Sequence, residues 1–172
     1  RFALSDRSKS HFEDKDISRW FDNIHCFLIN HKTSIDFSFY LGYAVHIMTD
    51  IIWQENIFNR FHQEYQKIKQ PGFLNERQAY VSEMCLLDIQ IYNTEIAFRK
   101  EIRNFLQQAK AIGIHPFVSD EEIEKEKELT LLWYDNKKTD LMSVPNLITI
   151  TDVYRLIAMA SEEICLRLKN VI

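Results

Sequence analysis

The sequence predicts an all-α fold, a single-domain bundle of about six helices. Glycine and proline, which most often interrupt regular structure, occur only three times each among 172 residues. The alternation of apolar and polar residues that is typical of strands is scarce. A hydrophobic fraction of 46% beside 27% charged residues is that of an ordinary globular protein. We therefore expect residues 1–172 to form one helical domain.

Capping and turn residues divide the chain into the expected helices. Asp16 suits the N-cap of the first helix, and Asn75, with a glutamine three residues later, suits the start of the third. The second helix is expected to break near residues 54–56 and to stop before Pro71, and Gly113 is expected to be the C-cap of the fourth. The expected ranges are 17–30, 34–70, 75–92, 94–111, a fifth helix from 119, and a sixth over 151–169.

Charge and hydropathy exclude two classes of protein. The net charge is −4 and there is no run rich in lysine or arginine, so nucleic-acid binding is not expected. The longest apolar run, residues 40–53, is interrupted by His46 and Asp50 and is too short to span a bilayer. We therefore expect no integral membrane segment. The oligomeric state has no signal in the sequence.

The cysteines indicate a reducing environment. Cys26, Cys85 and Cys165 are odd in number, far apart, and include no CxxC pair. A disulfide framework and a thiolate zinc site are therefore not expected. Each cysteine has apolar neighbours, which predicts buried, reduced thiols and a cytoplasmic location.

His46 and Asp50 stand four residues apart within the apolar stretch FYLGYAVHIMTDIIW, residues 39–53. Side chains at positions i and i+4 of a helix lie above one another, with Cβ atoms roughly 6 Å apart. An imidazole nitrogen and a carboxylate oxygen together suit zinc. Two explanations stay open at this point: a metal site, or a buried His–Asp hydrogen bond that ties helices together. The pair alone favours the second, because two ligands do not make a site.

Three pieces of the sequence follow one another in a definite order: Ser10-His11-Phe12, then the run Phe39 to Tyr43 followed by His46, Thr49, Asp50 and Trp53, and then the segment LLDIQIY with Asp88 and Tyr92. This order resembles the zinc-dependent phospholipase C-like family of bacterial helical proteins. The similarity covers about the first half of the chain, and its most specific part is the GYxxHxxTD portion.

The resemblance implies a phospholipase C-like fold and a set of metal ligands. His46 and Asp50 match the metal-binding His-x-x-x-Asp pair, and His11 matches the metal-site histidine. Asp88 matches a recurrent acidic position that either ligates the metal or orients a ligand. The family pattern also has an N-terminal histidine and an upstream aspartate with no counterpart in this chain. We therefore expect a natural N-terminal segment before Arg1.

The function implied is zinc-dependent hydrolysis of a phosphoester. Zinc lowers the pKa of bound water and polarises a phosphoryl oxygen. Asp50 is the expected catalytic carboxylate, either accepting the proton of that water or bridging two metals. The substrate class is a small molecule or a phospholipid head group. The alternative is a catalytically silent helical scaffold or interaction protein, in which the His/Asp cluster is structural.

Three further polar residues are candidates for the same site. Asp88 has apolar neighbours on both sides, so its carboxylate is expected to reach a ligating histidine or the metal. Glu55 follows the His–Asp pair and is a candidate for contact with the ligands. His62 either lines the cleft or lies on the surface. The sequence contains no HD dipeptide, P-loop, HExxH motif or nucleophile elbow. The enzyme classes that these motifs identify are therefore not indicated.

Overall fold

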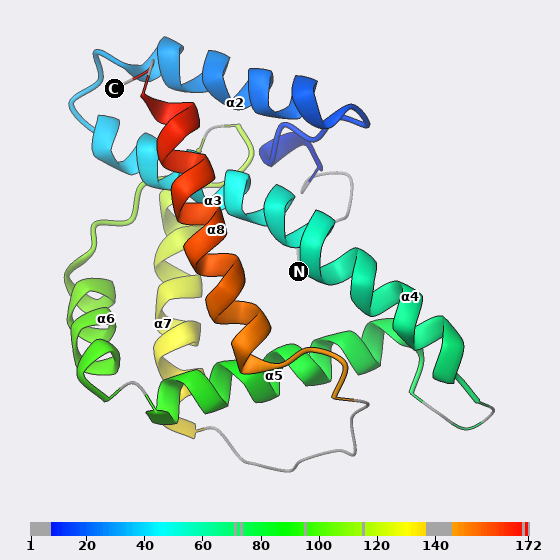
Figure 1. Cartoon of the computed structure of the whole chain (residues 1–172). Helices are drawn as coiled ribbons and strands as arrows, with labels where there is room; N and C mark the ends of the chain where they lie inside the picture. The colour runs from blue at the N-terminus through cyan, green and yellow to red at the C-terminus, as the bar shows by residue number, and fades with distance from the viewer. Residues whose placement is uncertain are drawn as a thin grey trace.

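The computed structural model describes residues 8–70, 72, 74–94, 96–114, 116–136, 146–169 and 171. Over these ranges the protein is all-α, with no strand beyond an isolated bridge between Ile114 and Val118 (Figure 1). The all-α class expected from the sequence is confirmed, and the described residues form seven helices rather than about six. These are α2 (Ile17–His31), α3 (Phe37–Trp53), α4 (Asn59–Ile68), α5 (Glu76–Thr94), α6 (Ile96–Gln108), α7 (Asp120–Asn136) and α8 (Ile150–Leu168).

The additional helix comes from division of the expected second one. A π-helical turn, η1 (Gln54–Phe58), separates α3 from α4 without a loop. The break expected near residues 54–56 falls on this turn. A π-turn bonds i to i+5 and so contains more residues than an α-helical turn, which makes the faces of α3 and α4 point in different directions.

Side-chain caps begin the helices where the sequence predicted them. Asp16 accepts from the backbone N–H groups of Ser18 and Arg19 at 2.9 and 3.4 Å. Asn75 and Gln78 exchange two side chain–backbone hydrogen bonds of 3.2 and 3.0 Å. Such bonds satisfy N–H groups that have no partner within the helix.

Gly113 is not the expected C-cap. The helix α6 already ends at Gln108, and Gly72 is the glycine with positive φ among the described residues. A Cβ atom on Gly113 would lie 2.5 Å from the backbone oxygen of Val118. Glycine is needed here because two backbone segments approach closely, not because a helix ends.

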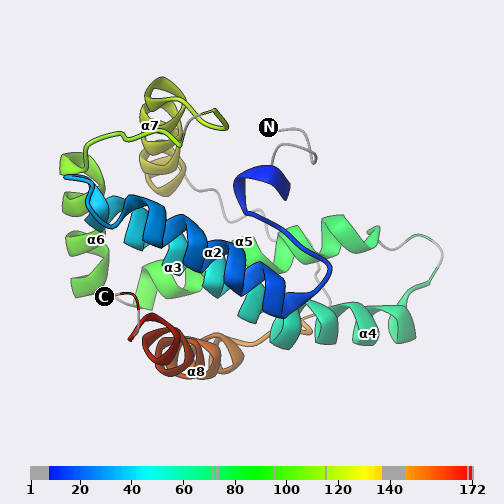
Figure 2. The same ribbon diagram turned by 90° about the horizontal axis from the view of Figure 1, so that it is seen from above.

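The core is built around α3, which lies between α2 and α8 (Figures 1 and 2). The buried residues of α3 occupy one face. In α8 five apolar residues at helical spacing are buried, whereas Ile157 is 50% exposed. The buried side chains are Trp20, Phe21, Ile24 and Leu28 of α2, Ala44, Ile47, Met48, Ile51 and Ile52 of α3, and Val153, Leu156, Ala160, Ile164 and Leu168 of α8.

The three cysteines are free, but they are not all buried. Cys26 and Cys165 are exposed and Cys85 is partly buried. The expectation of buried thiols is therefore wrong for these two: Ile24 and Ile164 nearby are buried, while Cys26 and Cys165 lie on the outer sides of their helices. No helix in the described ranges has the length and apolar character needed to cross a membrane.

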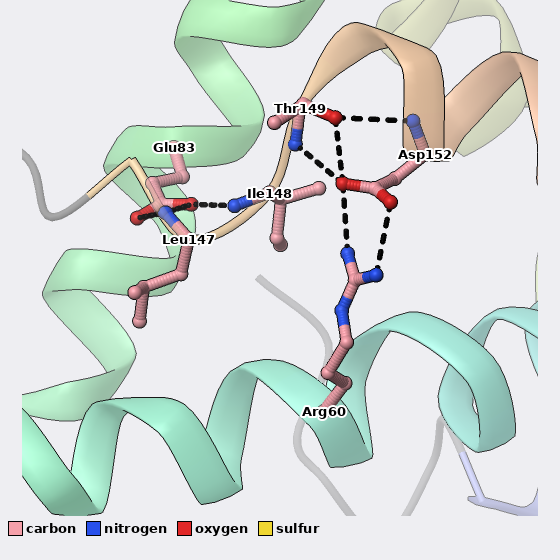
Figure 3. Close-up of polar contacts among 6 residues, drawn as sticks. All are labelled: Arg60, Glu83, Leu147, Ile148, Thr149 and Asp152. Carbon is pink, nitrogen blue, oxygen red and sulfur yellow. Dashed lines mark hydrogen bonds and ion pairs between the residues drawn. The ribbon is translucent and has the colours of Figure 1, made fainter.

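A polar cluster attaches the beginning of α8 to α4 (Figure 3). The carboxylate of Asp152 accepts hydrogen bonds from Arg60 Nη1 at 2.9 Å, and from the hydroxyl and backbone N–H of Thr149 at 2.7 and 3.0 Å. Arg60 Nη2 adds an ion pair at 2.8 Å. The Arg60 guanidinium first, and then the Thr149 donors, hold the pKa of Asp152 well below its usual range.

This lowered pKa predicts a loss of stability in acid. A carboxylate with a depressed native pKa stabilises the fold above its unfolded pKa of about 3.9, and this contribution is lost as the pH falls through the native pKa. At pH 7 we expect Asp152→Asn to lower the free energy of unfolding by about 1–2 kcal/mol, allowing for a partly exposed ion pair. The difference between the variant and the parent should begin to shrink below about pH 4, and it should vanish only as the pH falls through the lowered native pKa of Asp152. Urea unfolding at a series of pH values from 7 down to about 2 measures this, and a difference that does not change with pH would contradict it.

Candidate metal centre

The site begins on the face of α3 that does not enter the core. Tyr43, His46 and Asp50 are spaced by three and four residues and therefore lie along one side of the helix. The His46 side chain is 56% exposed and the Asp50 side chain 29% exposed. The buried residues of α3 fill a different face, so this polar stripe is reachable from solvent.

His11 comes to this stripe from the end of a short helical turn. Residues 8–10 are helical, and Phe12 has a φ of 55°. The N–H of Glu13 donates to Ser8 O at 3.0 Å and that of Phe12 to Lys9 O at 3.2 Å. These two bonds form a Schellman C-cap, in which the chain reverses immediately after the last helical residue. The left-handed conformation costs Phe12 about 1–2 kcal/mol, which its packing on Phe27 offsets at a ring separation of 4.9 Å.

Three consecutive carbonyl groups of this turn accept hydrogen bonds from side chains of α2 and α3. Tyr43 donates to Ser10 O at 2.7 Å. The indole of Trp20 donates to His11 O at 2.6 Å, and Asn23 donates to Phe12 O at 3.2 Å. Carbonyls at the end of a helix lack partners within the helix, so these donors both satisfy them and attach the turn. His11 is therefore held by two neighbouring helices.

The structure brings His11, His46 and Asp50 together. Asp50 Oδ2 lies 3.7 Å from Nε2 of His11 and 3.9 Å from Nε2 of His46. One ligand atom from each residue lies within 4.8 Å of the others. Both histidine–carboxylate distances are too long for hydrogen bonds. Two ligands of one tetrahedral zinc ion are about 3.4 Å apart, so small side-chain rotations would let a single ion reach all three.

Asp88 does not join this group. Its side chain is exposed on α5, although burial by its surroundings still raises the pKa of the carboxyl group. The buried stripe of α5 consists instead of Ala79, Glu83 and Leu87, at intervals of four residues. Asp88 follows Leu87 and is thus turned away from the core. The four-residue spacing was visible in the sequence, and it identifies Glu83 as the acidic residue that enters the interior.

Glu55 and His62 also lie outside the ligand group. Glu55 is exposed and lines a neighbouring hollow together with Gln54 and Asn59. His62 is half exposed and pairs through Nδ1 with Glu76 at the start of α5. Of the two readings open for His62, the surface position is the one observed.

An open pocket of about 480 Å³ adjoins the triad. His11 and Asp50 line one part of it, and Glu13 adds a further carboxylate. Its aromatic lining consists of Trp20, Trp53, Phe58 and Tyr80. The indole of Trp53 donates to the Tyr80 hydroxyl at 2.7 Å, which fixes the orientation of both rings. No lysine or arginine occurs among the described residues that line the pocket.

The chain was compared with protein-family models, with curated proteins and with solved structures, and none of them matches it. The interpretation of the site therefore depends on its own chemistry.

Proposed function

We propose that the protein is a zinc-dependent hydrolase of phosphoesters, related to the phospholipase C-like family. The observation that carries the proposal is the convergence of His11, His46 and Asp50 beside an open pocket, at separations longer than hydrogen bonds. Two imidazoles and one carboxylate are a ligand set known from catalytic zinc sites, which keep one position open. Bound zinc would supply Lewis acidity and a water molecule acidified toward neutral pH.

Each residue of the site has a role under this proposal. His11 and His46 offer neutral Nε2 atoms, and Asp50 supplies the negative charge that offsets part of the charge of the cation. Asp50 is also the carboxylate nearest to both imidazoles, so it is the group that would accept a proton during hydrolysis.

The pocket supports a phosphoester with a single charged phosphoryl group. Its described lining is aromatic and acidic and lacks cationic side chains. A nucleoside triphosphate needs several cationic partners, whereas one phosphoryl group needs only the metal. The aromatic walls suit the apolar part of an ester, such as the region near a lipid head group or a small organic alcohol.

The alternative, a silent scaffold with a structural His/Asp cluster, has less support. A structural cluster is expected to be buried and hydrogen-bonded. Here His46 is 56% exposed, and its 3.9 Å separation from Asp50 exceeds a hydrogen bond.

Hydrolysis of bis(4-nitrophenyl) phosphate tests the proposed function. The chain is freed of metal, reconstituted with zinc, and assayed with and without a chelator. We expect activity that the chelator abolishes and that His46→Ala reduces by more than about 100-fold. His62→Ala is the matched control, because it removes a half-exposed imidazole outside the triad. Activity that resists the chelator, or that falls equally in both variants, would overturn the proposal.

A further inference from the structure

Tyr43 lies on the same polar stripe of α3 as His46 and Asp50, but it is not one of the three candidate metal ligands. It lies one turn before His46 on α3, and its ring is 6.3 Å from that of His11 and 6.4 Å from that of His46. A phenol is not needed to complete the ligand set. Its position beside both histidines, whose rings are 5.5 Å apart, therefore calls for another explanation.

The hydroxyl of Tyr43 holds the residue next to His11. It donates to the carbonyl oxygen of Ser10 at 2.7 Å, across 33 residues of sequence. Burial is the main cause that raises the pKa of Tyr43, so the phenol stays protonated and continues to donate at neutral pH. The Tyr43 side chain thus attaches to α3 the end of the helical turn from which His11 projects.

Ser10 in turn contacts the imidazole itself. Its Oγ lies 3.0 Å from Nδ1 of His11, and the residue is 6% exposed. When Nδ1 carries the proton and donates a hydrogen bond to Ser10 Oγ, Nε2 is the unprotonated nitrogen, the form that can bind a metal. Nε2 is the atom that faces Asp50 at 3.7 Å. Hydrogen bonds to the second nitrogen of a ligating histidine are a general means of fixing its tautomer and orientation.

We propose that Tyr43 and Ser10 are positioning residues that present Nε2 of His11 to the metal. The inference rests on the proposed metal site and adds a relay to it, from Tyr43 through Ser10 to His11. One face of α3 then contributes two ligands directly and positions the third. Trp20 and Asn23 of α2 hold the same turn, so the spacing of the site depends on how α2 and α3 pack together.

The test compares Tyr43→Phe with Tyr65→Phe. Tyr65 also donates its hydroxyl to a backbone carbonyl, that of Leu74, but on α4 and outside the triad. Both variants lose one hydrogen bond of the same type, so their free energies of unfolding should fall by similar amounts. We expect Tyr43→Phe to weaken zinc binding by about 10–100-fold, the range for groups that orient metal ligands. Tyr65→Phe should retain the parent affinity, measured by competition with a chromophoric chelator.

A second measurement is independent of zinc. In the metal-free protein at a pH where histidine is neutral, the ¹⁵N shifts of the His11 ring report which nitrogen carries the proton. The parent should favour protonated Nδ1, and both Ser10→Ala and Tyr43→Phe should increase the fraction protonated at Nε2. If Tyr43→Phe does not fold, the His11 ring shifts of Ser10→Ala alone test the positioning role.

The outcomes separate this inference from the proposed function. Unchanged His11 shifts in both variants, or equal zinc affinity in Tyr43→Phe and Tyr65→Phe, would overturn the positioning role. A parent protein that binds no zinc would overturn the proposed function, while the ring shifts would still decide whether Tyr43 and Ser10 orient His11.

Discussion

Replacement of Asp50 by asparagine is expected to lower zinc affinity by more than about 100-fold. This exceeds the loss of about 10–100-fold that is usual for residues that only hydrogen-bond to a metal ligand. The amide is nearly the same size as the carboxylate, but it is neutral and a poor ligand for zinc. Asp50 is the one anionic member of the triad, so its charge cannot be replaced by His11 or His46. Zinc titration of the metal-free protein, followed by calorimetry, measures the change.

Asp88→Asn is the matched control for this prediction. It makes the same change in a carboxylate that is exposed on α5 and outside the ligand group. We expect it to bind zinc like the parent. Equal losses in the two variants would contradict the ligand set derived from the structure and would restore Asp88 as a ligand, the role implied by the sequence resemblance.

Replacement of Glu83 by alanine is expected to lower the free energy of unfolding by about 3 kcal/mol, through loss of a buried charged acceptor. Glu83 is 2% exposed. Its carboxylate accepts from the backbone N–H of Leu147 at 2.9 and 3.0 Å and from that of Ile148 at 2.8 Å (Figure 3). Alanine would leave both N–H groups without this acceptor in a partly or fully buried place. Urea denaturation at pH 7 measures the loss.

Glu163→Ala provides the comparison for Glu83. This carboxylate is 39% exposed and pairs with Arg167 one turn along α8. Its removal should cost less than about 0.5 kcal/mol, as is usual for such surface pairs. Glu83→Gln keeps one acceptor oxygen and should fall between the two. If Glu83→Ala lowered the free energy of unfolding as little as Glu163→Ala, the Glu83 carboxylate would not be what holds the segment before α8 in place.

Local signals in the sequence were sufficient to predict most of the helices. Asp16 and Asn75 cap helices because their side chains bond to N–H groups only two or three residues away. The pairing of His46 with Asp50 likewise follows from helical spacing. What could not be predicted depends on distant parts of the chain. Gly113 is required by the backbone near Val118, which helix-ending rules do not consider.

The candidate site could be predicted only in part, because local spacing gives the His46–Asp50 pair but not the contacts between distant parts of the chain. His11 could be assigned only through a family resemblance, because its position depends on hydrogen bonds from Trp20 and Tyr43 across the fold. Asp88 was chosen as a candidate because its immediate neighbours are apolar. Burial in a helix follows the residues three and four positions away instead, and that pattern selects Glu83.

The central claim is that His11, His46 and Asp50 bind one metal ion, and anomalous scattering at the zinc edge tests it most directly. Crystals of the chain grown or soaked with zinc are expected to give an anomalous peak about 2.0–2.2 Å from Nε2 of both histidines and from the Asp50 carboxylate. A peak at His62 and Glu76 instead, or no peak at the triad in crystals that contain zinc, would contradict the account.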